Sequence, residues 1–196
     1  MAIPLRCACG KLQGEVEPGK VAARAVCYCK DCQAFARFLG RESELLAGAG
    51  GTEVASALPG AVRFTSGVEH LACMSLSPRG LYRWYAACCN TPIGNTPRAV
   101  TTPYIGLMRA CLAAPPDTLD RQLGRARIMV ETGSALGRVR PTPLRTAWAV
   151  ARIGSMMLGA RLTGAYRDNP FFQPGASQPL RRPRVLTIDE RAALTR

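Results

Sequence analysis

Three cysteines within six residues are the part of this sequence best suited to do chemistry. Cys27, Cys29 and Cys32 lie in the segment CYCKDC, and no histidine is near them. On an extended strand, residues two apart face the same side, so Cys27 and Cys29 would point together. A turn into a following helix would bring Cys32 back towards them. Three thiolates placed in this way can hold one zinc ion at Zn–S distances of about 2.3 Å.

The fourth ligand of such a zinc ion decides what the site does. With three protein ligands, one coordination position stays available for water or substrate, which is the arrangement of catalytic zinc. A distant fourth cysteine would instead close the site and make it structural, and the spacing leaves both alternatives open. The N-terminus of the predicted helix, together with Arg24, Lys30 and Arg37, would favour thiolates. These three basic residues could also hold a substrate carboxylate, or they could serve only solubility.

A second group of cysteines comes from two distant segments. Cys7 and Cys9 lie in CACG near the start, and Cys88 and Cys89 lie in AACCN. Two ligands from a knuckle and two from a later strand end are typical of a structural zinc site, which would connect the first strand to a late one. Adjacent strand residues point to opposite faces, so we expect one of Cys88 and Cys89 to serve only in packing.

The number and placement of the cysteines favour metal over disulfides. There are nine, an odd number, and pairs such as Cys7 with Cys9 are poorly placed to bridge each other. The first ten residues contain no apolar stretch of a secretory signal, which predicts a reduced, cytoplasmic chain. We therefore expect two zinc ions per chain. Cys73 and Cys111 lie in apolar surroundings and are predicted to be core residues.

The charge of the chain is strongly basic and uneven. The formal net charge is +13; residues 1–100 carry 11 basic and 7 acidic side chains (+4), and residues 101–196 carry 15 and 6 (+9). Nearly all the basic residues are arginine. This balance favours acidic partners such as anionic thiols, phosphates, nucleic acid or a membrane surface, without choosing among them. A solvated basic surface without such a partner is the alternative.

Patterning in the first hundred residues predicts short strands. Alternation and β-branched residues indicate strands over 12–17, 21–29, 70–76 and 80–89. A short helix is expected from residue 30, ending at Gly40. The segment 90–97, NTPIGNTP, is rich in turn residues and is predicted to be irregular.

The second half of the sequence has helical character. We predict helices over 119–136 and 144–166, and a last short helix that starts at Thr187 with a capping box. The helix over 144–166 is the most apolar segment, but Arg152 near its centre argues against a transmembrane span. Trp148, Met156 and Met157 form a stripe that predicts core packing. Contact of this helix with a membrane surface is a weaker alternative.

These patterns together predict a mainly β fold with an α-helical C-terminal extension. The chain is long enough for one sizeable domain with such an extension. We place a zinc-binding β domain in residues 1–100 and a basic, helical extension that packs on it in residues 101–196.

The cysteine motifs also resemble those of a known family. C-A-C-G near the start, C-Y-C-K-D-C-Q about twenty residues later and a cysteine-bearing strand end some sixty residues on resemble the glutathione-dependent formaldehyde-activating enzymes, a family that includes centromere protein V. The resemblance covers roughly residues 5–100. It implies an Mss4-like β fold with two zinc sites, one structural and one catalytic. Carried over, the structural ligands are Cys7, Cys9 and Cys89, and the catalytic ligands are Cys27, Cys29 and Cys32.

The sequence departs from this family in its late motif. The family pattern resembles F-C-x-x-C-G, whereas this chain has YAACCN, with Ala86 at the place of the first cysteine and Asn90 at the place of the glycine. Cys88 would substitute for the missing ligand, or that site would have three protein ligands.

The resemblance implies a carbon–sulfur lyase that acts on adducts of glutathione or another thiol with an aldehyde. The alternative is a non-catalytic zinc-binding module whose basic tail contacts nucleic acid, and the altered late motif leaves open a family member without catalysis.

Overall fold

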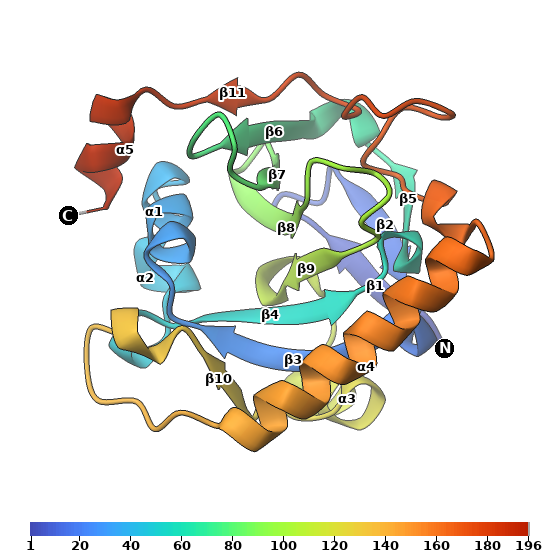
Figure 1. The fold of residues 1–196 in the computed structure, drawn as a ribbon. Coiled ribbons are helices and arrows are strands. Elements are labelled where there is room, and N and C mark those ends of the chain that lie inside the picture. Colours follow the sequence, from blue (N-terminus) through green and yellow to red (C-terminus); the bar gives the residue numbers. More distant parts are fainter. Residues whose placement is uncertain (196) are drawn as a thin grey trace.

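β-structure dominates the computed structural model, which describes residues 1–195. In these residues, eleven strands form two sheets, with α-helices placed around them (Figure 1). The smaller sheet has the strand order β1-β2-β5, and the larger has the order β10-β3-β4-β9-β8-β7-β6-β11. The predicted mainly β class is confirmed.

The strands are short, and most alternate or bury both faces. In β1, Ile3 and Leu5 are buried while Pro4 and Arg6 are exposed, the period-two pattern of a half-buried strand. The bounds in the smaller sheet are β1 (Ile3–Arg6), β2 (Gln13–Val16) and β5 (Val62–Ser66). Those in the larger sheet are β3 (Val21–Cys27), β4 (Thr52–Ala57), β6 (Leu71–Ser75), β7 (Tyr82–Ala86), β8 (Thr91–Thr96), β9 (Ile105–Met108), β10 (Ile128–Val130) and β11 (Arg184–Val185).

The helices begin and end at recognisable signals. Their bounds are α1 (Lys30–Phe38), α2 (Glu42–Leu45), α3 (Pro116–Leu123), α4 (Pro143–Leu162) and α5 (Ile188–Leu194). Gly40 follows α1 with φ +66°, a conformation that glycine adopts easily, so the predicted stop is confirmed. Thr187 forms the predicted capping box with Glu190 at the start of α5. In Figure 1, α1, α2 and α5 lie together at one end of the large sheet, and α4 crosses in front of β3.

Residues beyond position 100 contribute to the large sheet itself. β9 pairs with β4 and with β8, β10 adds to β3 in parallel, and β11 adds to β6 in parallel. The two units predicted from the sequence, 1–100 and 101–196, therefore meet within one sheet.

The prediction of an irregular segment over 90–97 is wrong. All six residues of β8 are buried, and the strand pairs with β7 on one side and β9 on the other. A Cβ atom on Gly94 would lie 2.9 Å from the Ile105 side chain, so glycine allows the two strands to approach. The Trp84 indole donates to the Thr96 hydroxyl at 2.9 Å. These tertiary contacts override the turn preference of the segment.

The predicted helix over 119–136 is also mostly wrong. α3 ends at Leu123, and Gly124 follows with φ +75°. Residues 128–130 then form β10, because their apolar side chains pack along the edge of β3. The second predicted helix is confirmed as α4, although it ends at Leu162 rather than at Tyr166.

α4 lies on the surface with one face against the sheet. Trp148 is 56% exposed, so the prediction that it belongs to the core is wrong; Met156 and Met157 are half-buried. The helix is apolar on nearly all sides, so spacing alone could not show which face packs. Leu158 and Leu162 are also exposed. Among residues 1–195, no helix has the length and apolar character that crossing a membrane requires.

Candidate metal sites and the adjoining cavity

The three cysteines of CYCKDC converge in the structure. Cys27 is the last residue of β3, Cys29 is the N-cap of α1, and Cys32 lies in the first turn of that helix. Their sulfur atoms lie within 4.8 Å of one another, as the spacing predicts. We call this group the three-cysteine cluster. Among the residues that the structure describes, no fourth cysteine, histidine or carboxylate joins it.

The start of α1 favours negative charge on this cluster. The backbone N–H of Cys32 donates to Cys29 Sγ at 3.3 Å. Contacts with the Cys27 and Cys29 sulfurs, helped by the nearby Arg83 guanidinium, hold the pKa of Cys32 well below its usual range although burial opposes this. The same sulfur contacts, those to Cys29 and then Cys32, raise the pKa of Cys27. These contacts therefore favour the thiolate of Cys32, and a bound cation would favour the others.

A cavity of about 370 Å³ adjoins the three-cysteine cluster. Its walls come from β3, β4, β10 and one face of α4, with single side chains from β7 and β8, Gly106 of β9 and the start of α1. The lining residues are Ala23, Ala25, Cys27, Cys29, Asp31, Cys32, Val54, Ser56, Leu81, Arg83, Asn95, Tyr104, Gly106, Ile128, Val130, Thr146, Ala149, Val150 and Ile153.

Arg83 is the basic residue of this cavity, and the sequence analysis missed it. It is only 3% exposed, donates to Asn95 Oδ1 at 3.2 Å and lies 3.7 Å from Asp31. Its guanidinium also lies over the Phe35 ring, 5.4 Å from the centroid. A charged residue inside the apolar strand YRWYA was the signal that could have identified it, because charges are rarely buried without a partner or a role.

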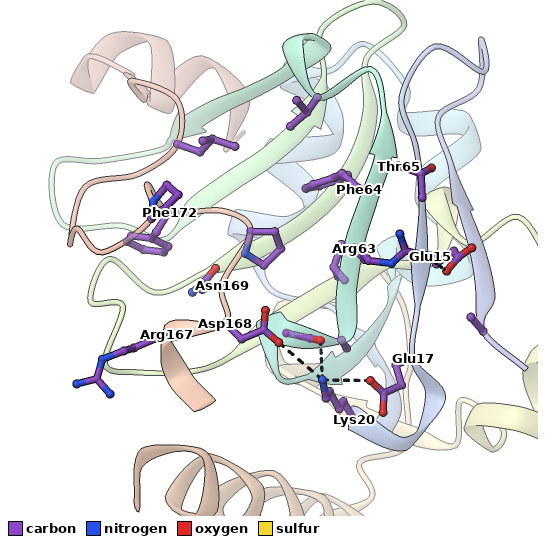
Figure 2. Close-up of a pocket in the computed structure, with 18 of the residues that line it drawn as sticks. Glu15, Glu17, Lys20, Arg63, Phe64, Thr65, Arg167, Asp168, Asn169 and Phe172 are labelled. Atoms are coloured by element: carbon purple, nitrogen blue, oxygen red, sulfur yellow. Dashed lines mark hydrogen bonds and ion pairs between the residues drawn. The ribbon is translucent and has the colours of Figure 1, made fainter. Parts of the chain in front are cut away.

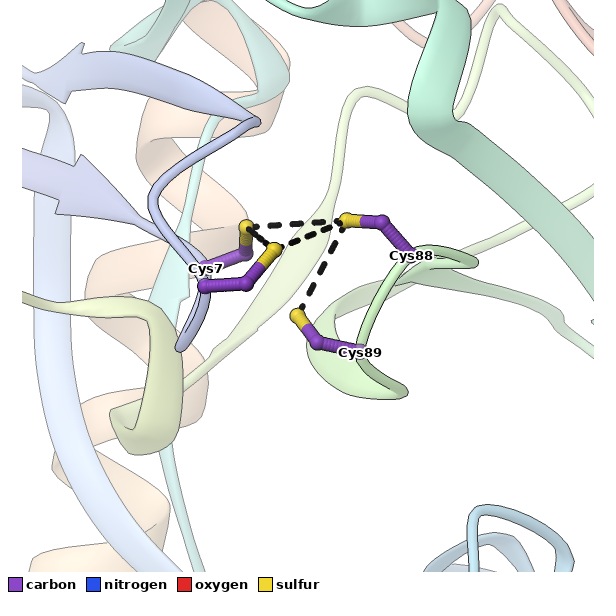
Figure 3. Close-up of side chains that lie close together, drawn as sticks. Cys7, Cys88 and Cys89 are labelled. Carbon is purple, nitrogen blue, oxygen red and sulfur yellow. Dashed lines mark hydrogen bonds between the residues drawn. The ribbon is translucent and has the colours of Figure 1, made fainter.

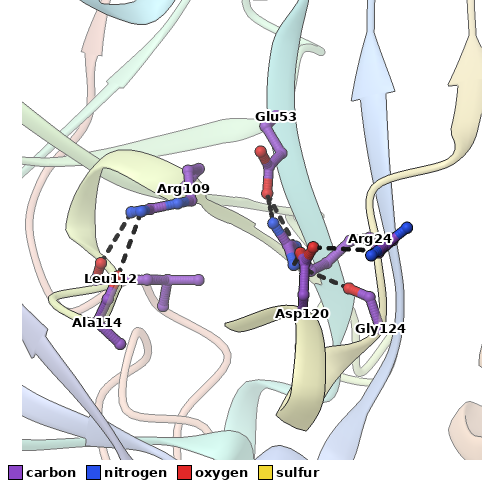
Figure 4. A network of polar contacts seen from close by, with 8 residues as sticks. Arg24, Glu53, Arg109, Leu112, Ala114, Asp120 and Gly124 are labelled. Carbon is purple, nitrogen blue, oxygen red and sulfur yellow. Dashed lines mark hydrogen bonds and ion pairs between the residues drawn. The ribbon is translucent and has the colours of Figure 1, made fainter. Parts of the chain in front are cut away.

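The basic residues expected around this cluster are engaged elsewhere. Arg24 is buried and donates to Glu53, Asp120 and the Gly124 carbonyl (Figure 4). Arg37 donates to Glu42 and to the Leu194 carbonyl. Lys30 is exposed and is not among the residues that line the cavity. Neither Arg24 nor Arg37 lines the cavity, and both donate to partners away from it, so the expected carboxylate-binding role beside this cluster is wrong for these two residues.

The second group of cysteines brings four sulfurs together. Cys7, Cys9, Cys88 and Cys89 lie within 4.8 Å of one another (Figure 3), and we call them the four-cysteine cluster. The Cys9 and Cys88 sulfurs are 3.3 Å apart, and Cys7 lies 3.5 Å from Cys9 and 3.8 Å from Cys88. Tetrahedral zinc with Zn–S bonds near 2.3 Å separates its sulfurs by about 3.8 Å, so the donor set is close to this arrangement.

Both Cys88 and Cys89 reach the four-cysteine cluster, so the expectation that one serves only in packing is wrong. The two residues follow β7 on a turn, where Asn90 has φ +54°, and the alternation of a strand does not apply there. The Thr91 hydroxyl lies 3.2 Å from Cys89 Sγ. Burial opposes ionisation of Cys89, but this contact and those with Cys9 lower its pKa to about 6.

The donor sets of both clusters suit a soft cation. Sulfur-only ligands in this arrangement are typical of zinc or iron, and the structure supports the statement that each cluster could hold a metal ion. Cys73 and Cys111 are buried in the core, as predicted, and take no part in either cluster. Burial raises the pKa of each of these two thiols to about 12.

A larger cavity lies at the other side of the molecule, beside β5. Its volume is about 810 Å³, and most of its charged groups are paired with each other (Figure 2). Lys20 contacts Glu17, Asp168 and the Gly60 carbonyl, and Arg63 pairs with Glu15. No cysteine lines it, so the chemistry of the clusters is not available there.

The fold and the two cysteine clusters together describe a mainly β protein with two candidate metal sites. The chain belongs to a family of unknown function, DUF6151, whose model matches residues 1–175. A crystal structure of a Rhodobacter sphaeroides protein, a structural-genomics target, is similar at 21% identity; the match covers 63% of this chain and 97% of that chain, with a TM-score of 0.40. No curated protein matches the sequence.

Proposed function

We propose that the protein is a zinc-dependent carbon–sulfur lyase that acts on adducts of glutathione or another thiol with an aldehyde. The observation that carries this proposal is the three-cysteine cluster at the wall of a cavity of about 370 Å³. Three protein ligands beside a cavity suit a site that accepts a substrate, whereas a structural site needs neither the cavity nor the free position. The resemblance of the cysteine motifs to formaldehyde-activating enzymes supplies the reaction class.

The four-cysteine cluster takes the structural role in this proposal. It joins the segment between β1 and β2 to the turn between β7 and β8. An Mss4-like arrangement with two zinc ions per chain is part of the same proposal.

The reaction requires only bond exchange and proton movement. Zinc held by Cys27, Cys29 and Cys32 would supply a Lewis acid at the cavity wall. In the lyase direction the carbon–sulfur bond of the hemithioacetal breaks, its hydroxyl loses a proton and becomes the carbonyl oxygen of the aldehyde, and the sulfur receives a proton. Nothing is oxidised or reduced.

Two hydroxyl groups in the cavity can move this proton. Tyr104 lies 3.4 Å from Ser56 Oγ, and both line the cavity. Burial raises the pKa of Tyr104, so its hydroxyl is protonated at neutral pH and can donate to the carbonyl oxygen when the adduct forms. In the lyase direction it acts as a relay, accepting the proton of the adduct hydroxyl while its own proton passes on towards the departing sulfur. Arg83 acts as a positioning residue, because its charge favours the Cys32 thiolate while Asn95 and Asp31 hold it in place.

Metal analysis combined with exchange spectroscopy tests this function. We expect two zinc ions per chain, and faster exchange between free aldehyde and hemithioacetal, measured by NMR on formaldehyde and a thiol, when the protein is present. Cys29→Ser should lose one zinc ion and the acceleration. Cys73→Ala, a change outside both clusters, should keep two zinc ions per chain and the acceleration. Equal exchange rates with and without the protein would contradict the proposal.

A second candidate function, binding of nucleic acid by the C-terminal region, has one observation in its favour. Residues 132–167 contain six arginines and no acidic residue, and all six arginines are exposed. Arg127, Arg138, Arg140 and Arg145 line one shallow cavity. If this function holds, the affinity for duplex DNA should fall steeply as the salt concentration rises. The double variant Arg138→Ala, Arg140→Ala should make the slope of log affinity against log salt shallower by the amount expected for about two lost phosphate contacts. Affinity that does not depend on salt would remove this candidate.

A further inference from the structure

The inner face of α4 builds one side of the cavity beside the three-cysteine cluster. Thr146, Ala149, Val150 and Ile153 line the cavity, and they lie outside residues 5–100, the part of the chain whose cysteine motifs resemble the formaldehyde-activating enzymes. Ala149 packs against a buried cluster of strand residues formed by Ala23, Ala25, Val54, Met108 and Ile128. α4 therefore decides what fits beside the cluster, and its contribution is apolar apart from Thr146.

The remaining wall of the cavity is also mostly apolar. Away from the cysteines, nine lining side chains are aliphatic: Ala23, Ala25, Val54, Leu81, Ile128, Val130, Ala149, Val150 and Ile153. Leu81 and Val150 are 41% and 62% exposed, which places them where the cavity reaches solvent. A molecule that enters passes between aliphatic groups before it reaches the sulfurs.

The charged groups of the cavity leave no partner for an ionic substrate. Only Asp31 and Arg83 are charged among the lining residues, and they lie 3.7 Å apart. Arg83 is further engaged by Asn95 and by the Phe35 ring. Glutathione carries two carboxylates and an ammonium group, and burying these without partners is costly. A cavity of about 370 Å³ also lies at the small end of the range for ligand sites.

We propose that the thiol substrate of this protein is small and apolar, an aliphatic thiol or its aldehyde adduct, and that Ile153 and Ala149 of α4 select it against glutathione. This inference rests on the proposed function, because it takes the three-cysteine cluster as the site where the sulfur of the substrate lies.

A ligand series on the cobalt-substituted protein tests the selection without measuring turnover. Ethanethiol, butanethiol and glutathione are titrated, and the change in the cobalt d–d absorption is followed, with Cys29→Ser as the reference that lacks the site. Burial of a methylene strengthens binding about fourfold, so butanethiol should bind at least about tenfold more tightly than ethanethiol. Glutathione should bind at least about tenfold more weakly than butanethiol.

A matched pair of variants on α4 assigns the selection to its inner face. Ile153→Lys places a cation in the cavity wall, and it should lower the affinity for butanethiol at least about tenfold while improving that for glutathione. Leu158→Lys makes the same kind of change on the exposed face of α4, where Leu158 is 59% exposed, and should change neither affinity. Ile153→Ala, a milder change, should weaken butanethiol binding about threefold and keeps the test valid if the lysine variant fails to fold.

The outcomes separate this inference from the function on which it rests. If no thiol changes the cobalt spectrum, the substrate position at the three-cysteine cluster is wrong and the proposed function fails. If glutathione binds as tightly as butanethiol or more tightly, or if Leu158→Lys acts like Ile153→Lys, the apolar selection is wrong while the proposed function stands.

Discussion

The two cysteine clusters differ in where their ligands come from. The four-cysteine cluster joins segments about eighty positions apart, since Cys9 and Cys88 are separated by 79 residues. The three-cysteine cluster uses one segment of six residues, which β3 and α1 already hold in place. Closing a long loop costs conformational entropy that a bound metal can offset, whereas a local cluster closes almost nothing. We therefore expect the four-cysteine cluster to support the fold and the three-cysteine cluster to be free to serve chemistry.

Replacing a ligand of the four-cysteine cluster should have the largest effect. Cys9→Ser removes one of four sulfurs that hold the β1–β2 segment to the turn after β7. We expect loss of one metal ion and a decrease in the free energy of unfolding of about 4 kcal/mol or more, because structural zinc contributes folding energy directly. Urea unfolding with metal analysis measures both. If the variant is as stable as the wild type, the proposed structural role of the four-cysteine cluster is wrong.

The matching change in the three-cysteine cluster should affect stability much less. Cys29→Ser should also lose one metal ion, yet its free energy of unfolding should fall by only about 1 kcal/mol. Serine at this position can still accept the N–H bond that Cys29 accepts from Cys32 as the N-cap of α1. If Cys29→Ser lowers the free energy of unfolding as much as Cys9→Ser does, the contrast between the clusters is lost and so is the substrate position.

Replacing Arg83 or Thr91 should change the pH at which metal is released, and each replacement should affect only the cluster that it adjoins. Arg83 helps to lower the pKa of Cys32, so Arg83→Gln should raise it, and protons should displace metal from the three-cysteine cluster at a pH about one unit higher. Thr91 helps to lower the pKa of Cys89 to about 6, so Thr91→Val should do the same at the four-cysteine cluster.

The measurement for this pair is metal release against pH, followed with a colorimetric chelator. The wild type should show two steps, and each variant should move one of them towards higher pH. Movement of both steps in either variant would show that the clusters are coupled, and no movement would mean that these neighbours do not control the thiolates.

The sequence was enough to predict the three-cysteine cluster, because its members lie within six residues of one another. Cys27, Cys29 and Cys32 converge because a strand end and a helix start follow from nearby residues. The turn that carries both Cys88 and Cys89 to one cluster could not be predicted from spacing alone. Asn90 has φ +54° there, and its side chain donates to the Leu39 carbonyl at 3.2 Å, a contact that only the folded chain brings together.

The cavity could not be predicted either, because its residues meet only through tertiary structure. β8 contains Pro92, Gly94 and Asn95, which indicate turns in isolation, and it is a strand because β7 and β9 lie on both sides of it. Arg83 depends on Asn95 of that strand for its position. α4 was predicted as a helix, but its apolar side chains on nearly all faces gave no indication of the one that lines the cavity.

The two cysteines outside the clusters should produce the smallest effect, at high pH. The pKa of Cys73 and that of Cys111 rise from 9.0 to about 12 by burial, so the folded state holds their protons more tightly than the unfolded chain does. Their contribution to stability is therefore complete below about pH 9 and is lost as the pH rises towards 12. Cys73→Ala should make the decline of unfolding free energy over this range shallower, measured by urea unfolding at pH 8, 10 and 11. An unchanged slope would show that the Cys73 thiol does not ionise on unfolding. The loss of stability above pH 9 would then come from Cys111 and from the cysteines of the two clusters.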